Sequence, residues 1–162
     1  MVKIVGIDPG LAATGIGIVC GTGVKVASFS YGSINTSQKT PLPQRLDHIF
    51  SKLNIILKNE KPDLMVVEDV FSLEKYPKSG IILGKVVGVV LLAGCQANAA
   101  IMEVPVREAK QVLTGNGKAT KDQLERAVRK FLGLEKPIRP FHASDALGMA
   151  LIGLFRYGST GT

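Results

Sequence analysis

The stretch VKIVGIDPGLAATGIGIVC, residues 2–20, contains two short apolar runs separated by the turn-forming sequence DPG at 8–10. The runs, VKIVGI at 2–7 and TGIGIVC at 14–20, are rich in the residues that favour strands. A third run of this kind covers about 24–34. We therefore expect the chain to open with a meander of three strands, the first of which ends at an acid, Asp8.

The remaining pattern alternates helices and strands. Apolar residues at helical spacing from 46 to 57 predict a helix that starts near the PLP at 41–43 and ends before Pro62. Residues 63–68 predict a strand without polar alternation, as expected when both faces are covered. The later elements are expected at 77–98 (helix), 100–104 (strand), 105–113 (helix), 120–132 (helix) and 142–156 (helix). Thr120 and Gln123 have the spacing of a capping box. The predicted fold is α/β, a five-stranded mixed sheet flanked by helices on both faces, in a single domain over 1–157 with a short tail at 158–162.

Composition limits the function classes. A chain of 162 residues with 46% hydrophobic residues suits one globular domain. Lys and Arg number 20 against 13 Asp and Glu, a net charge of +7, and residues 107–139 alone hold nine basic and four acidic side chains. This excess favours a polyanionic partner such as nucleic acid.

The cysteines and the apolar runs bear on location. Cys20 and Cys95 fit neither a CxxC motif nor a disulfide framework, so we expect free thiols and a cytoplasmic protein. The N-terminus meets Asp8 and Pro9 before a signal-like stretch develops, and the longest uninterrupted apolar run, 86–95, is too short to span a bilayer. No membrane association is expected.

Two acids stand at strand ends, where ligands gather in such sheets. Asp8 ends the first strand and Glu68 the fourth, so the two become neighbours if these strands pair. Asp8 alone could be a turn residue before Pro9. Glu68 follows Leu-Met-Val-Val and is costly to bury without a cation or a donor. Asp69 points the other way along the strand, and we expect it to face solvent.

The last helix supplies a second polar pair. His142 and Asp145 are three residues apart and share one helical face in an otherwise small and apolar stretch. They could be a capping pair, but together with Asp8 and Glu68 they predict a metal site. Three carboxylates and one imidazole suit Mg²⁺ or Mn²⁺ better than zinc. Two such ions could activate water and stabilise the leaving oxygen in phosphodiester hydrolysis.

Gly80, Gly84 and Gly88 recur every four residues and give the helix at 77–98 a smooth face. This face could press on the chain's own sheet or on a second subunit. His48, on the first helix, and Lys85 receive no role.

Six motifs in order resemble the RuvC-type Holliday-junction resolvases. They are GIDPG at 6–10, TGIG at 14–17, GSINT at 32–36, VEDVF at 67–71, GNGKATKDQL at 115–124 and HASDALGMA at 142–150. The resemblance runs over nearly the whole chain. It implies an RNase H-like fold, a homodimer and Mg²⁺-dependent cutting of two opposed strands of a four-way DNA junction, in DNA recombination and repair. It also implies a branch-migration motor, RuvAB, as partner.

The resemblance also implies roles for single residues. Asp8, Glu68 and Asp145 match the catalytic, metal-binding acids, and His142 stands where family members have Asp or His. Phe71 matches an aromatic residue near the junction centre. Arg107, Lys110 and Lys121 match DNA-contacting positions, and Lys118 joins them by its place in the chain alone. Ile16, where an aromatic residue is common, and Asp69 are departures that bear on sequence preference.

Three rivals stay open. GIDPG also resembles the first phosphate loop of actin-like kinases and ATPases, which bind nucleotide between two such domains. A binding module on the same fold could recognise branched DNA without cutting it. An RNase H-like nuclease could act on hybrids or ends.

Overall fold

The computed structural model describes residues 1–70 and 77–158, which form one five-stranded sheet between two layers of helices. The strands are β1 (Val2–Asp8), β2 (Ala13–Thr22), β3 (Lys25–Asn35), β4 (Leu64–Asp69) and β5 (Ala100–Pro105). The helices are α1 (Leu42–Glu60), α2 (Pro77–Gln96), α3 (Val106–Thr114), α4 (Lys121–Leu132) and α5 (Phe141–Tyr157). The predicted order of elements is confirmed, with boundaries that differ by one or two residues.

The strand order is β3-β2-β1-β4-β5. β1 pairs antiparallel with β2 and parallel with β4, and β5 continues the parallel half. The sheet is therefore mixed, as predicted, and β1 lies at the point where the chain direction of neighbouring strands changes. Ligand sites in open α/β sheets form at the carboxyl ends of strands beside such a point.

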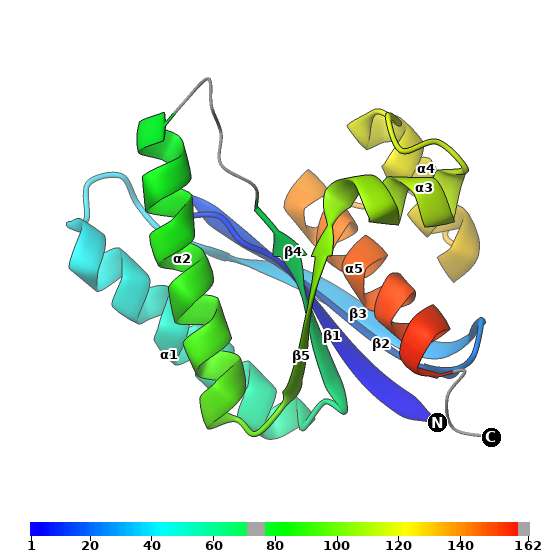
Figure 1. Cartoon of the computed structure of the whole chain (residues 1–162), viewed down its shortest axis with the longest axis horizontal. Helices are drawn as coiled ribbons and strands as arrows, with labels where there is room; N and C mark the ends of the chain where they lie inside the picture. Colours follow the sequence, from blue (N-terminus) through cyan, green and yellow to red (C-terminus); the bar gives the residue numbers. More distant parts are fainter. Residues whose placement is uncertain (71–76, 159–162) are drawn as a thin grey trace.

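The two faces of the sheet carry different helices (Figure 1). Val5, Ile7, Met65 and Val67 pack on one face in a core with residues of α1 and α2. Ile4, Leu64 and Val66 belong to the core on the other face, which contains residues of α3, α4 and α5. This division arises because successive side chains along β1 and β4 point to opposite faces of the sheet. Since both faces are covered by helices, β4 is apolar throughout.

Helix α4 begins as the sequence predicts. The Thr120 side chain accepts a hydrogen bond from Gln123 N, and Gln123 Oε1 accepts one from Thr120 N, which completes a capping box. The helix ends at Gly133, which has a left-handed conformation (φ 67°). Both boundaries are thus set by local sequence.

Helix α2 decides one open alternative and departs from one expectation. Gly84 and Gly88 are exposed, and a Cβ at either position would meet nothing within 4 Å, so these glycines do not press on the chain's own sheet. Residues Lys78–Gln96 are also long and apolar enough, by length and composition alone, to cross a membrane. The uninterrupted apolar run at 86–95, from which no span was expected, is shorter because Lys85 precedes it. Val86, Val90 and Ala93 face the core, while Ile81, Gly84, Gly88 and Leu92 lie on exposed surface.

Candidate active site

Asp8 and Glu68 lie side by side on the α5 face of the sheet. The parallel register pairs Ile7 with Val67, so Asp8 and Glu68 are the next residues on adjacent strands. Strand alternation places both on the same face as Ile4 and Val66. The prediction that the first and fourth strands bring these acids together is confirmed.

Helix α5 approaches this face at backbone distance. A Cβ on Gly6 would lie 2.0 Å from Ala146 O, and one on Gly15 would lie 1.9 Å from His142 O. Gly6, Gly15 and Gly17 therefore form a smooth floor on which the start of α5 rests. Because of this close contact, His142 and Asp145 reach the end of β1 that carries Asp8.

His142 contacts Asp8 directly. Its Nδ1 lies 2.8 Å from Asp8 Oδ2, a hydrogen-bonded pair in which Asp8 is buried and the His142 side chain is 42% exposed. The hydrogen bond from His142 to Asp8 raises the pKa of the imidazole, more than partial burial lowers it. The prediction that these elements bring an imidazole to a strand-end acid is confirmed.

Burial and neighbouring negative charge disfavour ionisation of the other two carboxyls, those of Glu68 and Asp145. Burial raises the pKa of Glu68 to about 9, and a hydrogen bond to Asp8 and the charges of Asp8 and Asp145 add to this shift. Burial and Asp8 also raise the pKa of Asp145 to about 6. Lys121 opposes both shifts. Three acids are thus crowded together with less positive charge than they require.

The chemistry of this donor set fits a hard divalent cation, since oxygen ligands predominate. Within residues 1–70 and 77–158, however, no three carboxyl, imidazole or thiol groups are arranged so that they could share one metal ion as they stand. Asp8 instead pairs with His142 and Glu68. Metal binding would require these mutual hydrogen bonds to be exchanged for metal–ligand bonds. The assignment of metal ligands stays a prediction.

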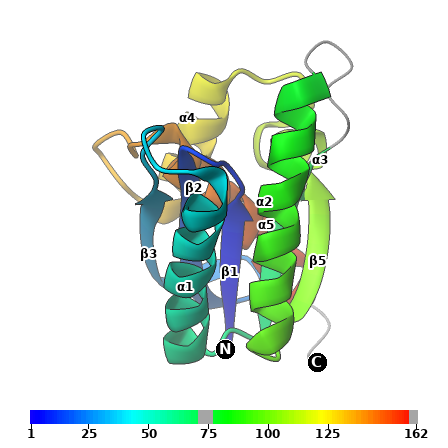
Figure 2. The same cartoon turned by 90° about the vertical axis from the view of Figure 1, so that its left-hand side faces the viewer.

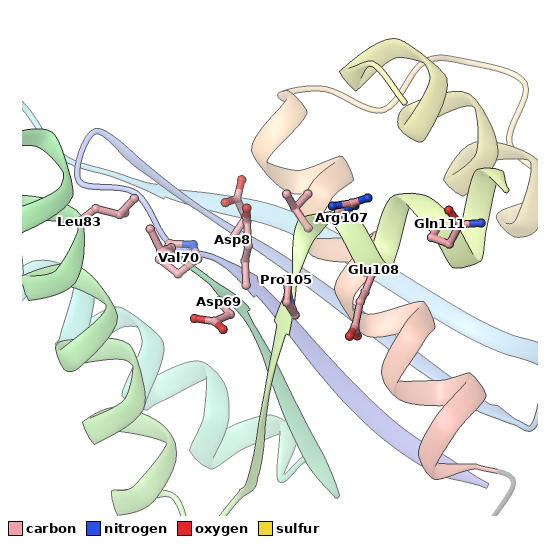
Figure 3. Close-up of a pocket in the computed structure, with 11 residues that line it drawn as sticks. Asp8, Asp69, Val70, Leu83, Pro105, Arg107, Glu108 and Gln111 are labelled. Carbon is pink, nitrogen blue, oxygen red and sulfur yellow. The ribbon is translucent and has the colours of Figure 1, made fainter. Parts of the chain in front are cut away.

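A cleft of about 870 Å³ opens beside the acids (Figure 3). Asp8, Glu68 and Val70 line it from the strand ends, Leu83 from α2, and Arg107, Glu108 and Gln111 from α3. Figure 3 shows Asp69 pointing away from Asp8. Asp69 is half-buried at the cleft wall, so it is less exposed than the sequence predicted but lies on the opposite face from Glu68.

The four predicted basic residues lie on α3, on the start of α4 and on the loop between them. Arg107 lines the cleft, and Lys121 and Lys110 both act on the pKa of Asp145. Lys118 is exposed on the loop, where its N–H donates to Asn116 Oδ1. The structure therefore brings Arg107, Lys110 and Lys121 beside the acids, whereas no contact joins Lys118 to them.

Several supporting residues escaped the sequence reasoning. Gln111 braces the basic loop, because its side chain donates to Gly115 O and accepts from Gly117 N. Glu125 is buried, accepts a hydrogen bond from Ile138 N and forms an ion pair with Arg129, which holds the segment that leads into α5. A buried Glu on an amphipathic helix was the available signal for Glu125. Nothing in the sequence distinguished Gln111.

Phe71 lies outside the described residues, so the structure does not bear on its predicted place near the junction. His48 is exposed on α1 and lines a separate small cavity with Arg45. Lys85 is exposed on α2 between Gly84 and Gly88.

Comparisons with known proteins agree over nearly the whole chain. Residues 4–153 match the family model described as crossover junction endodeoxyribonuclease RuvC. The protein of that name from Carboxydothermus hydrogenoformans is 39% identical over 156 residues, 96% of this chain and 98% of the relative. The one from Fusobacterium nucleatum is 37% identical over 97% of this chain and 82% of the relative.

Solved structures agree with these matches. Thermus thermophilus RuvC superposes with a TM-score of 0.85 at 31% identity, over 99% of this chain and 97% of that one. The same protein in complex with Holliday junction substrate gives 0.89 at 29% identity, with the same coverage. The yeast mitochondrial Holliday junction resolvase shares the fold, with a TM-score of 0.62 at 13% identity over 96% of this chain and 78% of that one.

Proposed function

Because this chain belongs to the RuvC family of crossover junction endodeoxyribonucleases, with the RNase H-like fold of that family, we propose that it cuts Holliday junctions. The observation that carries the proposal is the cluster of Asp8, Glu68, His142 and Asp145 at one sheet edge, beside a basic surface. A catalytically dead binding module would have no need to keep three crowded acids that destabilise its fold. The product would be two nicked duplexes, as recombination and repair require.

Asp8, Glu68, Asp145 and His142 would hold Mg²⁺, with Mn²⁺ as a substitute and two ions in each site. When bound, these ions supply an activated water and charge stabilisation of the leaving oxygen. The protein's own part is positional. Gly6 and Gly15 let α5 bring its two ligands to the strand ends, and Lys121 offsets part of the negative charge around them.

The DNA path would run over α3, the following loop and the start of α4. Arg107, Lys110, Lys118 and Lys121 would contact phosphates, which supply most of the affinity in such interfaces but carry no sequence information. Phe71 would stack on a base where the arms of the junction part. The cleft with Val70 and Leu83 would accept the strand that is cut.

The proposed assembly is a homodimer joined through α2. Ile81 is 63% exposed and Leu92 51% exposed, and Gly84 and Gly88 between them are open to close approach. An exposed apolar face of this kind marks an interaction surface. The exposed Lys85 within it disfavours membrane insertion. A two-fold enzyme would match a junction with two equivalent strands to cut.

Light scattering tests the dimer. Leu92→Glu should convert it to a monomer, while Lys58→Glu, on the surface of α1, should leave its mass unchanged. A monomeric wild-type protein would refute this assembly. The RuvAB motor as partner and the cytoplasm as location rest on family membership alone.

Cleavage of three substrates tests the function itself. A synthetic four-way junction, a linear duplex of the same sequence and an RNA–DNA hybrid are incubated side by side with Mg²⁺. Preferential nicking of two opposed junction strands is expected. Preference for the hybrid would instead favour an RNase H-like nuclease, and binding without cleavage would favour a binding module.

A further inference from the structure

A second cavity lies beside the loop that follows Asp8, and nothing in the mechanism above uses it. It has a volume of about 290 Å³, and its lining includes Asn35, Ser37, Thr40, Gln44, Arg45 and His48. These side chains all offer hydrogen-bond donors, and none of the lining residues in the described part of the chain carries a carboxylate. The loop from β3 to α1 that forms it lies at the same end of the molecule as the carboxyl end of β1 (Figure 2).

Thr36 links this cavity to the active site. Its N–H donates to Ala12 O at 3.0 Å, and its hydroxyl donates to Leu11 O. Thr14 Oγ1 donates to Gly10 O at 2.7 Å. Three successive carbonyls of the loop after Asp8 are therefore held by hydrogen bonds, two of which come from Thr36.

Arg45 completes the link. Its Nε donates a hydrogen bond to Thr36 Oγ1 at 2.8 Å. The Thr36 hydroxyl therefore accepts from the guanidinium and donates its own hydrogen bond to Leu11 O. Only one of the five N–H donors of Arg45 is used in this bond. The remaining donors belong to a side chain that lines the cavity, where no acid among the lining residues neutralises its charge.

We propose that this cavity, the Arg45 cavity, binds a backbone phosphate of the DNA strand that enters the active site. The guanidinium of Arg45 would pair with the phosphate, and His48 with the neutral side chains of Ser37 and Thr40 would donate further hydrogen bonds. Since Arg45 also holds Thr36, a bound phosphate would fix the loop that positions Asp8. The proposal rests on the proposed junction cleavage and adds a DNA contact outside α3 and α4.

Binding of a labelled four-way junction in EDTA, over a series of salt concentrations, tests the site without cleavage. Arg45→Gln should weaken binding about tenfold and lower the salt slope of log K by about one. His48→Glu places a carboxylate in the cavity without touching the Thr36 hydrogen bonds, and it should weaken binding by a similar factor. Lys58→Gln and Lys58→Glu, near the far end of the same helix, are the matched controls.

Single-turnover cleavage at saturating junction separates positioning from affinity. Thr36→Val should keep the wild-type salt slope yet slow cleavage, and Thr36→Ser, which retains the hydroxyl, should restore the rate. If Arg45→Gln folds poorly, the junction affinity of His48→Glu tests the proposal in its place. If His48→Glu and Lys58→Glu bind junctions with equal affinity, the proposal that the Arg45 cavity binds phosphate is overturned. A wild-type protein that does not bind junctions at all would refute the proposed function instead.

Discussion

The two faces of the central sheet are covered in different ways. On one face α5 rests on Gly6, Gly15 and Gly17 at backbone distance and carries polar residues into the contact. On the other face α1 and α2 stand off the sheet on Val, Ile, Leu and Met side chains. Close backbone contact fixes the position of α5, whereas contacts between large side chains allow repacking.

The two sides also differ in the side chains that they present. His142 and Asp145 lie at the start of α5 over the sheet, where the hydrogen bond to Asp8 raises the pKa of His142 and burial raises that of Asp145. The outer face of α2 holds exposed Ile81, Leu92 and Lys85 instead. The α5 side therefore suits the proposed chemistry, which needs fixed geometry, and the outer face of α2 suits the proposed dimer contact.

Removing a carboxyl from the α5 side should have the largest effect. Asp8→Asn, Glu68→Gln and Asp145→Asn should each lower cleavage by roughly a factor of 10³, the cost of losing a group that stabilises transition-state charge. Junction binding should persist, since less negative charge then faces phosphate. Gel shifts and cleavage assays on one preparation measure both. A variant that cuts at the wild-type rate would remove that residue from the mechanism.

A methyl group between sheet and helix should break the close contact itself. Gly6→Ala would place its Cβ 2.0 Å from Ala146 O, and we expect a loss of about 3 kcal/mol in the free energy of unfolding. Gly32→Ala is the matched control, because a Cβ there meets nothing within 4 Å. Urea denaturation of both variants measures the difference. Equal stability would show that α5 can move away from the sheet at little cost.

The charge crowding predicts that the metal-free protein loses stability as pH rises. Glu68 has a pKa of about 9 in the folded state, above its ordinary value, so folding favours its protonated form. The destabilisation is absent at low pH, develops above the unfolded pKa of about 4.3, and is complete above the folded pKa. In EDTA, Glu68→Gln should therefore raise the thermal midpoint at pH 8 but not at pH 4. A midpoint that shifts equally at both would contradict the crowding.

The order of helices and strands could be predicted because local sequence patterns determine it. The apolar runs of β1 and β4 and the capping box at Thr120 indicated these elements from neighbouring residues alone. The site residues followed from polar side chains in apolar surroundings. The Arg45–Thr36–Leu11 chain could not be predicted, because it joins three segments whose contact depends on tertiary structure. The open surroundings of Gly84 and Gly88 likewise depend on which face of α2 meets the sheet.

Substitution of His142 should have a smaller effect, seen in the acid limb of the dependence of cleavage rate on pH. Its contact with Asp8 raises the imidazole pKa, and a protonated imidazole cannot bind metal. Activity should therefore fall as pH drops through a value above about 6.5, the ordinary pKa of histidine. His142→Asp should stay active with a flatter acid limb. Rates measured from pH 5 to 9 in both proteins decide it, and an identical acid limb would argue against His142 as a ligand.

The smallest expected effect distinguishes two lysines near the same site. Lys118→Ala and Lys121→Ala should each lower the salt slope of junction binding by about one, since each removes one phosphate contact. Lys25→Ala, at the hairpin end of β3, is the control and should leave the slope unchanged.

Lys121→Ala should have a second consequence that Lys118→Ala lacks. Lys121 lowers the pKa values of Glu68, His142 and Asp145, so its loss should raise all three and move the acid limb of cleavage to higher pH. No contact joins Lys118 to these three groups, and its variant should keep the wild-type profile. The pair of variants therefore separates phosphate binding from electrostatic support of the acids. If both profiles stay unchanged while both slopes fall, Lys121 serves DNA binding alone, and the acids depend on bound cations for all their compensation.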